Sequence, residues 1–246
     1  MKKVRLPLSF SLACAVYLLA AAVCVLPAVL CRRLGTVLSV LCSVVLTALL
    51  LCVFRCCGEL APLKEGKFFS KYLPLVLLFP ALYLVVRPIS GAGGLTLSEF
   101  LPWCAQMLTA VLWEELLFRY GAQLLFGRAE LFRLRTLIPT AVIFGAGAPF
   151  LLLRFAPVPH GNALAVCVAV CAAVFLTALQ LRTKNVLVPM TAHFLMRFTV
   201  EFTDRFASGV GAPEEDLFGT LLLCAAPLII GGILIARGRR AELNRN

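Results

Sequence analysis

Charged residues are scarce in this chain. Aspartate, glutamate, lysine and arginine make up 14% of the 246 residues, only 12 side chains are acidic, and histidine occurs twice. A soluble domain of this length is rarely so poor in charge, and here 61% of the residues are hydrophobic. The sequence also lacks internal repeats, heptads, a Walker loop, a GxGxxG turn and an HExxH zinc helix. These absences argue against a soluble fold, a coiled coil and the common nucleotide-binding folds.

Long runs of apolar residues dominate the sequence, and the mean hydropathy is +0.97. Several runs reach or approach the roughly 20 residues that a helix needs to cross about 30 Å of hydrocarbon. We therefore predict an all-α fold, a polytopic transmembrane helix bundle with about eight spans. Their expected positions are 7–31, 34–54, 72–86, 100–126, 137–153, 163–181, 186–204 and 217–236.

The net charge of +11 is explained by where the basic residues lie. With the N-terminus inside, 16 of the 23 lysines and arginines fall in inner segments and 5 in outer ones, while Arg119 and Arg197 lie within spans. By the positive-inside rule this bias predicts that both termini are cytoplasmic. We expect membrane lipid around the protein, and no nucleic-acid partner.

Cysteine is plentiful, with 11 residues, but the spacing of the cysteines does not indicate a disulfide framework or a metal site. Most of the cysteines lie inside apolar spans, where they behave as small hydrophobic side chains. Cys56 and Cys57 have neither CxxC nor histidine spacing, so they do not indicate a metal site.

Two adjacent carboxylates and a guanidinium lie inside the predicted span at 100–126. A charged side chain near the bilayer centre costs several kcal/mol, so it is kept mainly where it is paired and functional. Glu115 and Arg119 stand at i and i+4 and are predicted to pair on one helix face. Glu114 lies about 100° around the helix from Glu115, so it needs a partner from a different helix.

A second row of ionisable residues lies on the predicted span at 186–204. His193, Arg197 and Glu201 are spaced four residues apart and share one face of the helix. An Arg197–Glu201 pair beside a neutral His193 would satisfy this row but would leave Glu114 without a partner. We therefore expect Glu114 and His193 to line one cavity, with Arg197 bridging Glu114, Glu201 or both.

These residue types are suited to acid–base chemistry. A carboxylate withdrawn from bulk water can act as a general base on a water molecule. A histidine can bind a metal or form a hydrogen bond with a developing oxyanion. A proton-coupled transporter that uses Glu114, His193 and Glu201 as a relay is an alternative, although transporters more often show repeated halves or broken helices.

The segment Glu114-Glu115-x-x-Phe118-Arg119 resembles the EExxxR motif of the CPBP family, the CAAX-protease and bacteriocin-processing intramembrane endopeptidases. Downstream, Pro189-x-x-x-His193 resembles that family's last histidine motif.

Phe144-Gly-x-x resembles the start of the family's middle FxxxH motif. The resemblance covers about residues 98–205 as a protease core. It leaves 1–97 as N-terminal helices and loops, and 206–246 as an outer loop, a last span and a basic tail.

The resemblance implies a role for each matching residue. Glu114 corresponds to the base that activates water, while Glu115 and Arg119 support and orient the site. His193 corresponds to the histidine that binds a metal or stabilises the oxyanion. Side chains expected to support them are Phe118, Phe144 and Arg197. The implied activity is hydrolysis of peptide bonds in membrane-associated peptides or proteins, including prenylated ones, in the cytoplasmic membrane of a bacterium.

The sequence departs from the family pattern at two positions. The middle histidine is replaced by Ala148, and Arg197 stands where the family has Asn or Asp after the last histidine. Glu114 and His193 supply only two ligands, short of the usual three for catalytic zinc, so we expect no cofactor. An inactive relative that serves as a membrane scaffold or immunity protein is therefore a second interpretation.

Overall fold

The computed structural model of this chain describes residues 10–56, 69–86, 96–121, 125, 161–183, 185–206 and 217–243. This part of the chain forms seven α-helices and one π-helical turn. The helices are α1 (Phe10–Leu34), α2 (Thr36–Cys56), α3 (Phe69–Val86), α4 (Leu97–Glu115), α7 (Gly161–Thr183), α8 (Leu187–Phe206) and α9 (Leu217–Leu243). The predicted all-α fold is confirmed for these residues.

Each of the seven α-helices coincides with a predicted span, with two corrections. The span predicted at 100–126 is α-helical only from Leu97 to Glu115 and continues as a π-helix over Leu116–Gly121. The last helix extends to Leu243, through the basic stretch that we had placed in an inner tail. The one remaining predicted span, at 137–153, lies outside the described residues, together with Phe144 and Ala148.

Two of the helices are long and apolar enough to cross a membrane. Leu12–Leu34 and Thr36–Cys56 have mean hydropathies of 2.5 and 2.8, and three shorter apolar helical stretches accompany them within the described residues. Large aliphatic side chains on α1 and α2 point outward, among them Leu34 and Val37. A broad exposed apolar surface of this kind is typical of a surface that contacts a membrane or a partner.

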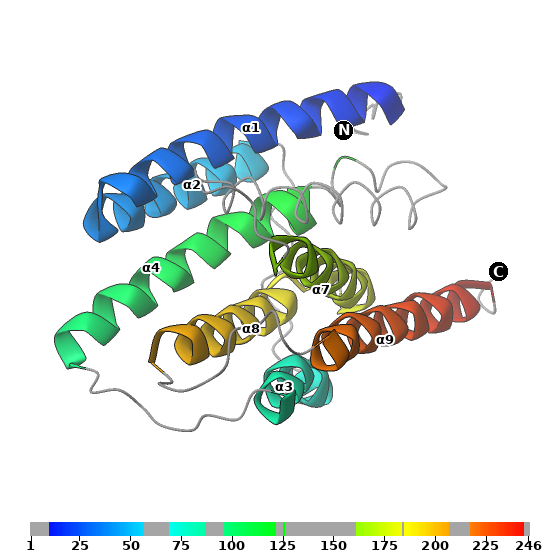
Figure 1. The fold of residues 1–246 in the computed structure, drawn as a ribbon. Helices are drawn as coiled ribbons and strands as arrows, with labels where there is room; N and C mark the ends of the chain where they lie inside the picture. Colours follow the sequence, from blue (N-terminus) through cyan, green and yellow to red (C-terminus); the bar gives the residue numbers. More distant parts are fainter. Residues whose placement is uncertain are drawn as a thin grey trace.

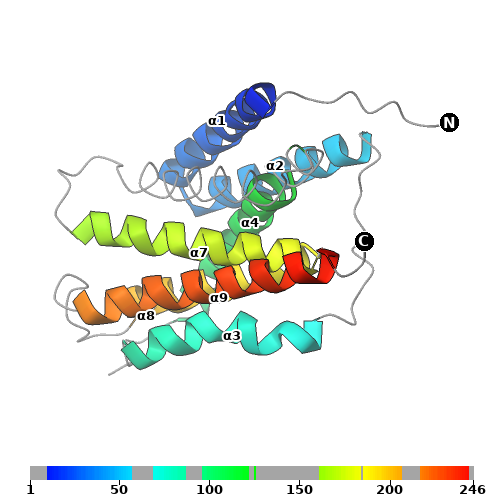
Figure 2. The same ribbon diagram turned by 90° about the vertical axis from the view of Figure 1, so that its right-hand side faces the viewer.

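The helices are arranged in layers around α4. Figure 1 shows α1 and α2 side by side above α4, with α7, α8, α9 and α3 below it. In Figure 2 α7 and α9 run next to each other, and α3 lies at the far side from α1. Helices α7 and α9 pack closely, since a Cβ atom at Gly231 would lie 3.4 Å from the Cα of Phe175.

Three apolar cores surround α4 in the described part of the chain. One joins α3, α7, α8 and α9, and includes Phe175. Another joins α1, α2 and the end of α4, and includes Tyr17 and Trp113. The third lies between α2, the end of α4, the π-helical turn and the start of α8, and includes Phe54 and Tyr120. The charged residues of the site lie between these cores, as a polar seam where α4 and the π-helical turn meet α8.

Candidate active site

A π-helical turn follows directly after the glutamate pair. All six of its residues, Leu116–Gly121, are buried. Turns of this kind are rare and are often found at functional sites, because they displace side chains from the α-helical path. The hydroxyl of Tyr17 on α1 donates a hydrogen bond to the carbonyl of Phe118 at 2.9 Å. A residue from a helix without an obvious site thus supports the backbone that carries Arg119.

Glu115 and Arg119 form the ion pair that their spacing predicts. Nη1 of Arg119 donates to Oε1 of Glu115 at 2.6 Å, and both side chains are 0% exposed. Breaking such a buried pair by removing one partner is costly, because it leaves a charge in a medium of low dielectric. The pair therefore fixes Glu115 in position.

His193 contacts both glutamates through its two ring nitrogens. Nδ1 lies 2.6 Å from Oε1 of Glu115. Since a carboxylate paired with Arg119 only accepts hydrogen bonds, we assign a hydrogen to Nδ1, which donates a hydrogen bond to Oε1 of Glu115. The other nitrogen, Nε2, faces Glu114 and lies 3.8 Å from its Oε2. Sequence spacing did not predict the contact with Glu115, because it depends on how α8 packs against α4.

Arg197 bridges two carboxylates on different helices. Its Nη1 lies 3.2 and 3.3 Å from the two carboxylate oxygens of Glu114, and its Nε donates to Oε1 of Glu201 at 2.7 Å. The bridge predicted from the sequence is therefore confirmed, and Arg197 contacts both glutamates. Trp103 extends the network, since its indole N–H donates to Oε2 of Glu201 at 3.3 Å.

The seam between α4 and α8 thus contains one continuous polar network, from Arg119 to Trp103. It holds three carboxylates and two guanidinium groups, so with a neutral His193 these five groups sum to one negative charge. Glu114, at 7% exposed, lies between His193 and Arg197. A carboxylate in this setting is held by directed hydrogen bonds rather than by bulk water.

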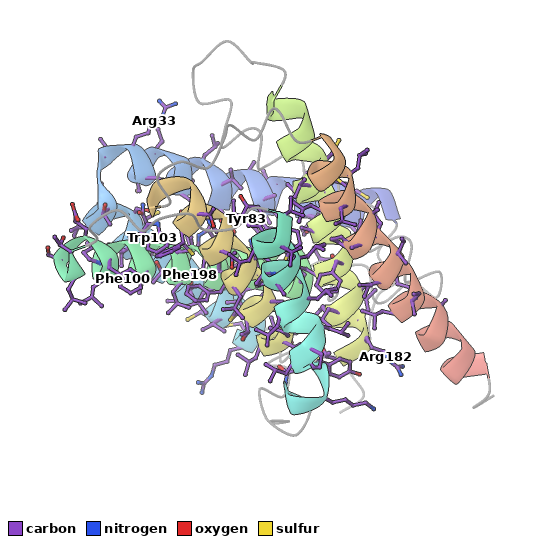
Figure 3. All side chains as sticks on the ribbon, turned by 60° about the horizontal axis from the view of Figure 1, so that its bottom comes forward. Arg33, Tyr83, Phe100, Trp103, Arg182 and Phe198 are labelled. Atoms are coloured by element: carbon purple, nitrogen blue, oxygen red, sulfur yellow. The ribbon has the colours of Figure 1, made fainter. Side chains whose placement is uncertain are left out.

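An aromatic wall lies beside the network. Figure 3 shows Trp103 with Phe100 and Phe198 beside it, where α4 meets α8. The ring centroids of Trp103 and Phe198 are 5.3 Å apart, and those of Phe100 and Trp103 are 5.9 Å apart. Phe118, which the family motif singled out, is buried against Trp113 with a centroid separation of 6.1 Å. It therefore packs behind the glutamate pair.

A cavity of about 30 Å³ opens next to Glu114, between α1, α2, α4 and α8. Its lining residues are Ala28, Arg32, Ser39, Ser43, Trp103, Gln106, Met107, Ala110, Trp113, Glu114, Arg197 and Glu201. His193 is not among these lining residues, although its Nε2 lies 3.8 Å from Glu114 and its Nδ1 contacts Glu115. The expectation that Glu114 and His193 line one cavity therefore stays a prediction. The polar lining from α2 was not anticipated from the sequence.

The described side chains around Glu114 do not fit a zinc ion. Within the described ranges no three His, Cys, Asp or Glu side chains converge as metal ligands. Both oxygens of Glu114 face the guanidinium of Arg197, so a cation from the protein occupies the position that a metal would need.

Comparison with known proteins identifies the region that holds this site. No curated protein and no solved structure matches the chain significantly. Residues 96–199 match the family described as "Type II CAAX prenyl endopeptidase Rce1-like". The matched region contains Glu114, Glu115, Arg119 and His193, which the sequence motifs select, and also Arg197, where the sequence departs from the family pattern. Residues 96–199 are therefore similar to the Rce1-like family of CAAX endopeptidases, in agreement with the resemblance of the EExxxR and Pro-x-x-x-His motifs.

Proposed function

We propose that this protein is an intramembrane endopeptidase that hydrolyses peptide bonds of membrane-associated peptides or proteins, prenylated or not. The observation that carries the proposal is the position of Glu114 Oε2 and His193 Nε2, 3.8 Å apart at the contact between α4 and α8. A gap of this size between two polar atoms is too long for a direct hydrogen bond and is suited to a bridging water.

The protonation of His193 supports a specific orientation for that water. With Nδ1 donating to Glu115, the Nε2 of a neutral imidazole is an acceptor, and so is the carboxylate of Glu114. One water molecule would donate its two hydrogens to these two acceptors. Its oxygen lone pairs would then point away from both, toward an approaching carbonyl carbon.

Hydrolysis then follows from ordinary acid–base chemistry. Glu114 takes a proton as the water oxygen adds to the carbonyl carbon, and the carbonyl oxygen becomes an oxyanion. Arg197 is the nearest described cation to Glu114 and would stabilise that oxyanion in a site of low dielectric. The C–N bond breaks as the proton passes from Glu114 to the departing amine, which leaves a carboxylic acid and an amine.

The proposal extends to location and topology. We place the chain as an integral protein of a bacterial cytoplasmic membrane, with about eight spans and both termini in the cytoplasm. The bias of basic residues toward one set of loops supports this orientation. Membrane lipid and a membrane-associated peptide are the proposed partners.

The test is cleavage of peptide panels, prenylated and unprenylated, by the protein reconstituted in vesicles. Glu114→Gln keeps the shape of the side chain but removes the base, and general-base catalysis typically contributes about 10²–10⁴-fold. We expect a loss of that size. Glu99→Gln is the matched control, because Glu99 lies on the same helix at its exposed first turn. Undiminished cleavage by Glu114→Gln would show that another residue is the base.

A second function has one observation in its favour. Arg197 covers both oxygens of Glu114 at 3.2 and 3.3 Å, and an ion pair weakens a carboxylate as a base. If wild-type protein cleaves none of the panel, the same peptides should be tested for binding. Binding without cleavage would favour an inactive family relative that acts as a membrane scaffold or immunity protein.

A further inference from the structure

The cavity beside Glu114 is small, although its lining spreads along several turns of α4. Its lining on α4 extends from Trp103 to Glu114, eleven residues apart, which corresponds to roughly 17 Å of helix. Its volume of about 30 Å³ is nevertheless enough for only one or two water molecules. An extended peptide does not fit a space of this size. The cavity is therefore a slot that excludes the peptide substrate.

The wall that α2 contributes to this slot is polar, although α2 is otherwise apolar. Ser39 and Ser43 stand one turn apart on the face toward α4, and both are buried. Within the described part of the chain neither side-chain hydroxyl has a hydrogen-bond partner. Buried hydroxyl groups are usually satisfied, by protein or by water. A water molecule in the slot would satisfy both.

The slot connects the surface of the bundle with the network. At one end lies Arg32, an exposed residue of the last turn of α1. Figure 3 shows its neighbour Arg33 pointing away from the bundle at the same end. At the other end lie Arg197 and Glu114. Polar groups from α1, α2, α4 and α8 therefore line a path from solvent to the proposed base.

We propose that this slot is the route by which water, the second substrate of hydrolysis, reaches Glu114. The inference rests on the proposed function. In this arrangement the two substrates reach Glu114 by different routes. Water enters between α2 and α4 from the end where α1 terminates, and the peptide approaches Glu114 from outside the slot. The side chains that define the route are Ser39, Ser43 and Gln106.

Radiolytic footprinting of the wild-type protein tests the route directly. Hydroxyl radicals formed from water oxidise methionines that contact it, and the chain contains two well-matched reporters. Met107 lines the slot and is 2% exposed, whereas Met196 belongs to the apolar core and is 4% exposed. Exposure alone predicts slower oxidation of Met107. We expect Met107 to be oxidised at least several-fold faster, and equal or slower oxidation would overturn the proposal.

Filling the slot provides the functional test. Ser43→Leu should lower the oxidation rate of Met107 to that of Met196 and reduce peptide cleavage at least tenfold. Val44→Leu, at an exposed position of the same helix outside the slot, should change neither rate more than twofold. Ser39→Val serves the same purpose if Ser43→Leu does not fold. Unchanged oxidation and cleavage in a folded filling variant would disprove the route. Rapid oxidation of Met107 in a wild-type protein that cleaves nothing would instead disprove the proposed function and leave the water path standing.

Discussion

Replacing Arg197 by alanine should destabilise the protein strongly, because two carboxylates lose their shared partner. Glu114 is 7% exposed, so its charge would remain buried and unpaired, a situation that typically costs 3–5 kcal/mol. Glu201 is 31% exposed and keeps its hydrogen bond from Trp103, so its share is smaller, about 0.5 kcal/mol. We expect the free energy of unfolding to fall by roughly 3.5–5.5 kcal/mol.

The measurement is reversible unfolding in mixed detergent micelles, carried out as a double-mutant cycle. In a Glu114→Gln background Arg197→Ala should cost only about 1 kcal/mol, since no buried charge is left behind. Arg182→Ala, at the exposed end of α7, is the control and should cost less than about 0.5 kcal/mol. A cost below about 1 kcal/mol for Arg197→Ala, or an equal cost in both backgrounds, would refute the assignment of Arg197 as the partner of Glu114.

Three further outcomes are expected. Gly231→Leu should lower the melting temperature, because α7 approaches within 3.4 Å of a Cβ at this position, whereas Gly232→Leu has open space within 4 Å and should be neutral or stabilising. Tyr17→Phe should cost about 1–2 kcal/mol in detergent unfolding, since it leaves a buried carbonyl of the π-helical turn without its donor; a cost indistinguishable from zero would mean that the bond contributes nothing. Combining Ala148→His with Arg197→Asn should create zinc affinity measurable by calorimetry, and tight stoichiometric zinc in the wild type would contradict our account of Arg197.

The contacts within one helix were predictable from the sequence, and so was the need for a partner from another helix. The i, i+4 spacing of Glu115 and Arg119 fixes their pairing wherever the segment is helical. The cost of a buried charge required a cation for Glu114, and Arg197 supplies it. These conclusions depend only on helix geometry and on the free-energy cost of burying an unpaired charge, which apply to any helical membrane protein.

The contacts that depend on helix rotation and packing were not predictable. Periodicity places His193 on the correct face of α8, but it does not decide which ring nitrogen meets which glutamate. The π-helical turn has the same apolar composition as an α-helix, so no residue type marks it. Tyr17 and Ser43 occur on helices without acidic residues, and only their packing against α4 brings them to the network.

The π-helical turn also has a consequence for how the length of this segment can vary. Each residue added to or removed from a helix rotates everything beyond it by about 100°. A single deletion between Leu116 and Gly121 would let the chain relax into an unbroken α-helix, and the residues beyond the deletion would then rotate relative to Glu114 and Glu115. Point substitutions in this turn leave the register intact. Homologous chains should therefore tolerate changes of apolar side chain in these six positions far more readily than insertions or deletions of one residue.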